Sequence, residues 1–97
     1  MKWRLSAPAR ADLDSIWRYT NEQWNQAQAD RYIDSLILRM VWLSKNEALW
    51  VDRSDIRDGL YSVSESRHVI FFQSTGETIS IVRVLHDRMD VARHIMR

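Results

Sequence analysis

The chain has 97 residues, of which 45% are hydrophobic and 28% are charged, a balance that excludes an intrinsically disordered protein. This length suffices for one domain over residues 1–97 and is too short for two. It contains no cysteine, which excludes disulfide scaffolds and thiolate metal sites, and its formal net charge of +1 excludes a protein that coats nucleic acid by charge alone. Neither a signal peptide nor a membrane-spanning apolar stretch is apparent, so we expect a cytoplasmic protein without membrane contact.

The first predicted elements are a strand and a helix. Apolar and charged side chains alternate over residues 1–6, which is typical of a strand with one wet face. Ser6 followed by Pro8 predicts the start of a helix that ends near Trp24. The apolar residues of this segment recur at helical spacing: Leu13, Ile16, Trp17 and Trp24.

A second helix is predicted from about Gln26 to Ser44. Asn25 is a suitable N-cap, with Gln28 three residues later, as in a capping box. The apolar stripe of this helix consists of Ala29, Ile33, Leu36, Ile37, Met40 and Leu43. Two amphipathic helices joined by a tight turn predict a helical hairpin.

The remainder is predicted to be mostly strand. Residues 45–59 are rich in turn formers and are expected to be irregular, although they include Trp50. Three segments rich in β-formers follow with short links, which predicts an antiparallel meander: Leu60–Val63, His68–Gln73 and Thr78–Leu85. Residues 90–97 are expected to form a helical turn capped by Asp90.

The order β-α-α-β-β-β predicts an α+β fold. The simplest packing lays the helical hairpin on one face of a small antiparallel sheet, with the first strand pairing at one edge. We expect the other face of the sheet to be partly open and available to a partner.

The last third of the chain carries the most specific motif. Residues 67–72 and 79–90, above all the segment "RVLHDRMD" followed by His94 and Ile95, resemble the ParE branch of the ParE/RelE toxin superfamily. Residues 5–19 are similar to the opening strand and first helix of that family, and residues 27–36 to its second helix. The resemblance therefore extends over nearly the whole chain.

The resemblance implies a RelE/ParE-like fold and the toxin role in a bacterial type II toxin–antitoxin system, such as those that support plasmid stabilisation. It implies a cognate antitoxin, often of the ribbon-helix-helix type, whose C-terminal segment wraps the toxin and holds it inactive in a hetero-oligomer. For the ParE branch it implies that the freed toxin inhibits DNA gyrase. For the sister RelE branch it would imply cleavage of messenger RNA on the ribosome.

The expected target-binding residues lie on the predicted sheet and its tail. They are Arg67, Arg83, His86, Arg88 and Met89. Arginine is enriched at interface hot spots, which favours this role, but ion pairing with nearby carboxylates is an alternative for each arginine. For Arg83, in mid-strand, a buried ion pair that fixes the sheet is the stronger alternative.

Two tryptophans are candidates for antitoxin binding. Trp42 lies away from the main stripe of its helix, and Trp50 lies in the irregular segment. Either one could receive apolar side chains of the antitoxin.

No cofactor and no metal are expected. Although His86, Asp90 and His94 are spaced by four residues, as helix-borne metal ligands would be, Asp90 is better interpreted as a helix cap. If the chain were an RNA endonuclease instead, Arg67, Arg88, His86 and His94 would be its catalytic candidates.

Lysine occurs only at Lys2 and Lys45. No lysine follows Lys45, so the three strands of the predicted meander lack the lysines that the nuclease branch places there, which favours inhibition of gyrase by binding over RNA cleavage. A third alternative is an interaction module that has lost its toxicity.

Overall fold

The computed structural model describes residues 2–95. Residue 1 of the predicted first strand and residues 96–97 of the predicted tail lie outside the described residues. The elements are β1 (Lys2–Leu5), α1 (Ala7–Gln23), α2 (Gln26–Trp42), the 3-10 turns Leu43–Lys45 and Glu47–Leu49, β2 (Val51–Asp52), β3 (Leu60–Glu65), β4 (His68–Ser74), β5 (Thr78–His86) and α3 (Val91–Ile95).

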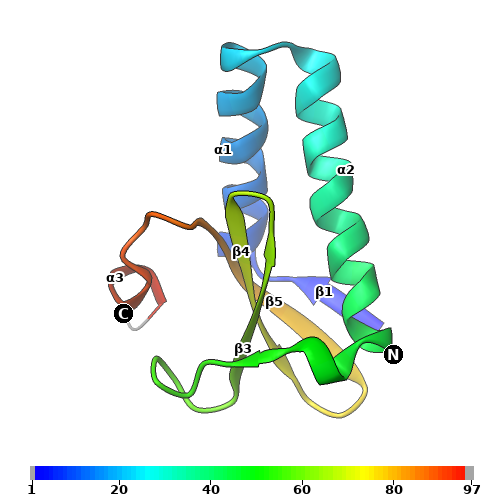
Figure 1. The fold of residues 1–97 in the computed structure, drawn as a ribbon, viewed down its shortest axis with the longest axis vertical. Coiled ribbons are helices and arrows are strands. Elements are labelled where there is room, and N and C mark those ends of the chain that lie inside the picture. Colours follow the sequence, from blue (N-terminus) through cyan, green and yellow to red (C-terminus); the bar gives the residue numbers. More distant parts are fainter. Residues whose placement is uncertain (1, 96–97) are drawn as a thin grey trace.

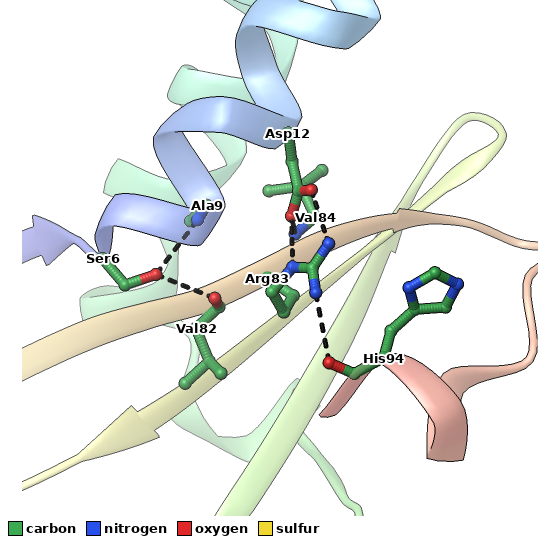
Figure 2. Close-up of polar contacts among 7 residues, drawn as sticks. All are labelled: Ser6, Ala9, Asp12, Val82, Arg83, Val84 and His94. Atoms are coloured by element: carbon green, nitrogen blue, oxygen red, sulfur yellow. Dashed lines mark hydrogen bonds and ion pairs between the residues drawn. The ribbon is translucent and has the colours of Figure 1, made fainter. Parts of the chain in front are cut away.

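Side-chain caps begin both long helices at the predicted positions. The Ser6 hydroxyl accepts a hydrogen bond from the Ala9 amide at 3.1 Å and donates one to the Val82 carbonyl of β5 at 2.8 Å (Figure 2). The Asn25 side chain accepts a hydrogen bond from the Gln28 amide at 2.8 Å. These contacts satisfy amides that have no partner within a helix, so the boundaries are set locally by the sequence.

The sheet has five strands in the order β1-β5-β4-β3-β2. The α+β class is confirmed, but the sheet is mixed, because β1 runs parallel to β5 whereas the other pairs are antiparallel. The alternation of side chains that predicted β1 is the same for either direction of pairing, so it could not distinguish them. The two-residue β2, within the segment predicted to be irregular, is too short to show a periodic pattern.

The main core lies between the helical hairpin and one face of the sheet. Leu36 and Met40 of α2 pack there against Ile79 and Ile81 of β5. The outer halves of both helices project beyond the sheet (Figure 1), and Trp24 at their tip is 75% exposed. The predicted apolar stripe of the first helix therefore extends past the residues that pack in the main core.

A second apolar cluster covers part of the opposite face of the sheet, which was expected to be partly open. Phe71 and Leu85 on this face pack against Ile56, from the loop between β2 and β3, and Ile95, from α3. A short apolar tail and one buried loop residue give little periodic signal, so the sequence did not reveal this second cluster. None of the helices within residues 2–95 has the length and apolarity to cross a membrane.

Candidate target-binding surface

Two turns at the same end of the sheet bring several of the predicted target-binding residues together. The Asp87 amide, after β5, donates a hydrogen bond to the carbonyl oxygen of Arg67, between β3 and β4, at 2.9 Å. Ser66, in the same β3–β4 turn, has a left-handed backbone with a φ of 55°. Arg67, Arg88 and Met89 are exposed on these joined turns, and we call these three residues the arginine surface.

His86 stabilises the turn that carries Arg88. Its Nδ1 atom accepts a hydrogen bond from the Arg88 amide at 3.1 Å and lies 3.1 Å from an oxygen of Asp87. Because one ring nitrogen cannot accept and donate at once, the bond from Arg88 requires the Nδ1 atom to be unprotonated. The imidazole therefore orders the turn that presents Arg88.

A second polar pair lies next to His86, on the side of the helices. The Tyr32 hydroxyl of α2 and His68 Nδ1 of β4 are 2.6 Å apart, and the rings of His68 and His86 meet edge to face. Burial, and then the neighbouring His86, lowers the pKa of His68, while burial raises the pKa of the Tyr32 hydroxyl. Both side chains are therefore uncharged at neutral pH, and the hydrogen bond between them joins α2 to β4.

The guanidinium of Arg83 is held within the protein. Its Nε and one Nη atom each donate to the Asp12 carboxylate of α1 at 2.8 Å, and its other Nη atom donates to the His94 carbonyl at 3.1 Å (Figure 2). The Asp12 carboxylate also accepts a hydrogen bond from the Val84 amide, at 2.9 Å. The hydrogen bonds from Arg83 to Asp12 raise the pKa of Arg83. Arg83 thus joins α1, β5 and α3, and target binding by it remains a prediction.

The four nuclease candidates are divided between two places in the fold. Arg67, His86 and Arg88 lie at the joined turns, whereas His94 lies on α3, where its carbonyl is bound to Arg83. Within residues 2–95, no hydrogen bond or ion pair joins the His94 ring to the other three side chains. In the same range, no three His, Asp or Glu side chains are grouped as metal ligands.

The two tryptophans predicted to bind antitoxin differ in their surroundings. Trp50 packs edge to face on Phe72 with 5.0 Å between ring centroids, and its indole nitrogen donates to the Leu43 carbonyl at 3.0 Å. It is thereby fixed at the rim of the main core. These contacts leave its role in antitoxin binding a prediction.

Trp42 borders a shallow hollow of about 290 Å³ between α2 and β3. The hollow is lined by Ser35, Leu38, Arg39, Trp42 and Glu65. Arg39 pairs with Glu65 at 2.9 Å and lies over the Trp42 ring at 4.6 Å, while Leu38 is 69% exposed. This hollow combines accessible apolar surface with a positioned ion pair.

Sequence reasoning did not identify Asp12, Tyr32 or Arg39 as partners of these residues. Asp12 and Arg83 are 71 positions apart, and Tyr32 and His68 are 36 positions apart. Contacts across such separations leave no local periodic signal, so only the fold reveals them.

Comparison with known proteins gives one family throughout. The family model described as the ParE toxin of the type II toxin–antitoxin system parDE matches residues 3–91. Toxin ParE1 of Mycobacterium tuberculosis (strain ATCC 25618 / H37Rv) is 37% identical over 95 residues, which cover 97% of each chain. Toxin ParE of Escherichia coli is 36% identical over 88 residues, which cover 90% of this chain and 85% of the relative.

One solved structure has the same fold. It is described as the chromosomal ParDE TA system from P. aeruginosa and superposes with a TM-score of 0.75 at 18% sequence identity. The superposition covers 89% of this chain and 95% of the other. At this level of identity the likeness concerns the fold alone.

Proposed function

The chain belongs to the ParE toxin family of type II toxin–antitoxin systems, and from this premise we propose that it inhibits DNA gyrase by binding, without chemistry of its own. We also propose that a cognate antitoxin, of the ribbon-helix-helix type, binds the chain in the cytoplasm and holds it inactive in a hetero-oligomer. Gyrase is the target that the ParE resemblance implies.

The observation that carries the proposal is that the family match includes the whole segment that builds the arginine surface. The match extends over residues 3–91, and Arg67, Arg88 and Met89 all lie within it. The backbone hydrogen bonds of the two turns fix where these side chains emerge. Arginine is enriched at interface hot spots, and a fixed backbone leaves only the side chains to be ordered on binding.

Two features favour binding over RNA cleavage. The candidate acid–base residue His94 lies apart from the arginine surface, on α3. His86 is engaged with the Arg88 amide, which gives its Nδ1 atom a structural task. We therefore propose that the arginine surface recognises a protein target and carries no general acid–base pair.

We propose that the antitoxin binds at the hollow beside Trp42, between α2 and β3. Leu38 in its lining is 69% exposed and Val41, also on α2, is 46% exposed, so an apolar partner that covered them would remove both from water. The P. aeruginosa structure of the same fold is described as a ParDE system, which supports an antitoxin as the partner. We propose that Trp50, at the rim of the main core, also contributes to antitoxin binding.

Supercoiling of relaxed plasmid by purified gyrase, with translation in a cell-free extract measured in parallel, tests the proposed target. We expect the protein to reduce supercoiling and leave translation unchanged, and added antitoxin to restore supercoiling. Normal supercoiling together with cleaved messenger RNA would instead assign the chain to the nuclease function. If the protein inhibits neither supercoiling nor translation, the chain is an interaction module without toxicity.

A further inference from the structure

A second hollow, of about 460 Å³, lies on the face of the sheet opposite the helical hairpin. Arg4 of β1, Gln73 of β4 and Ser80 of β5 are neighbours across three paired strands, and Arg57 approaches from the loop between β2 and β3. Thr75, from the β4–β5 turn, and Ser6, at the start of α1, also line it. No residue of this hollow belongs to the arginine surface or to the Trp42 hollow.

The hollow contains two positive charges and no negative one. Arg4 and Arg57 are the only charged residues in its lining, and neither forms an ion pair with a carboxylate among residues 2–95. Arg4 donates only its Nε atom, to the Ser80 hydroxyl at 3.1 Å, so its two Nη atoms remain available. This differs from Arg39, Arg53 and Arg83, each of which is paired with an acid.

Arg57 also carries an unsatisfied donor. Its Nε atom is buried and has no hydrogen-bond partner. Its backbone is fixed, because its amide donates to the Arg53 carbonyl and its carbonyl accepts from the Leu60 amide, both at 3.2 Å. A buried donor without a partner costs free energy, so this guanidinium is held beside the hollow without the contacts that usually compensate its burial.

We propose that this hollow binds a phosphate group. Two guanidinium groups supply two positive charges and planar arrays of donors, which match the oxygens and the charge of a phosphate monoester, about −1.5 to −2 at neutral pH. A single carboxylate would neutralise only one of them. The hydroxyl of Ser80 and the amide of Gln73 add neutral donors for the remaining oxygens.

The lining also indicates which part of a ligand is recognised. It contains no aromatic side chain on which a nucleobase could stack. Recognition is therefore of the phosphate and is independent of the base, whether the phosphate belongs to a small phosphorylated ligand or to a nucleic-acid backbone. The site lies on a different part of the sheet from the proposed gyrase-binding residues, and it stands whether or not gyrase is the target.

The test is a titration of the ¹⁵N-labelled full chain, followed by NMR of the arginine Nε–H resonances at constant ionic strength. The ligands are inorganic phosphate, adenosine monophosphate, a short DNA duplex and a hexaglutamate peptide. We expect saturable shifts of the Arg4 and Arg57 signals with phosphate and with the monophosphate. Binding should weaken about tenfold or more in Arg4→Gln and in Arg57→Gln, because each removes one charge-assisted contact.

Arg10→Gln is the matched control, since Arg10 is an exposed arginine on α1, outside the hollow, and its removal should leave phosphate binding unchanged. Thermal unfolding of each variant shows whether it is folded, and the exposed Arg4 provides the test if Arg57→Gln is unstable. Tighter binding of the duplex would identify a nucleic-acid backbone as the source of the phosphate, and binding of the monophosphate alone a small ligand. Equal phosphate affinity in the wild type and both hollow variants, or shifts with hexaglutamate only, would overturn the proposal.

Discussion

Replacing Asp12 with alanine should destabilise the protein more than replacement of any exposed carboxylate. Asp12 accepts two hydrogen bonds from the Arg83 guanidinium at 2.8 Å and one from the Val84 amide at 2.9 Å. The side chains of Arg83 and Asp12 are 21% and 13% exposed, so the variant leaves a mostly buried cation and a backbone amide without their acceptor.

The size of the effect follows from these contacts. Removing one partner of a buried ion pair costs about 3–5 kcal/mol, and the partial exposure of this pair places it at the lower end, about 3 kcal/mol. For a domain of this size such a loss lowers the melting temperature by about 15 °C. Urea unfolding followed by tryptophan fluorescence measures the free energy of unfolding directly.

Asp14→Ala is the matched control, because Asp14 is an exposed carboxylate on the same helix, and we expect it to change stability by less than about 0.5 kcal/mol. The double variant Asp12→Ala/Arg83→Met should lose less stability than the sum of the two single variants, because the second change removes the stranded charge. A loss below about 1 kcal/mol in Asp12→Ala, or additive effects in the double variant, would refute this account of Arg83.

Three further predictions concern the proposed surfaces and the partly buried His68. Arg88→Ala should abolish growth inhibition while the melting temperature stays within about 3 °C of the wild type, because Arg88 is exposed; a folded and fully toxic variant would contradict its assignment. Antitoxin binding should change the fluorescence of a variant that retains only Trp42, and unchanged emission from that variant and from one retaining only Trp50 would remove both from the interface. Burial lowers the pKa of His68 below its usual 6.5, so the unfolded chain takes up the proton first and stability should fall as pH decreases below about 6.5. His68→Gln should flatten this decline in urea unfolding between about pH 7.5 and 5.5, and an equally steep decline would show that other groups cause it.

The features that could be predicted from the sequence are those that neighbouring residues determine. Ser6 and Asn25 cap their helices as expected, since a cap needs only a suitable side chain a few residues before an apolar stripe. The β-formers of residues 68–73 and 78–85 likewise identified β4 and β5, each of which extends one residue further. The grouping of Arg67 with Arg88 followed from the family motif, and the backbone bond between their turns supplies its physical reason.

The features that could not be predicted depend on how distant segments meet. The parallel direction of β1 is set by its place beside β5, which its four residues do not encode. The partner of Arg83 is Asp12, 71 positions away, whereas the sequence suggested only carboxylates near each arginine. Arg4 and Arg57 are separated by the whole helical hairpin, so their shared hollow becomes visible only in the folded sheet.

The most direct test of the central claim is a binding measurement between purified gyrase and this protein, with Arg88→Ala and the exposed helix variant Arg18→Ala compared under the same conditions. We predict that the wild type and Arg18→Ala bind gyrase and inhibit supercoiling with the same affinity, and that Arg88→Ala, although folded, does neither. Absence of gyrase binding by the folded wild-type protein would contradict the proposed function, and equal binding by all three proteins would show that the arginine surface is not where gyrase is recognised.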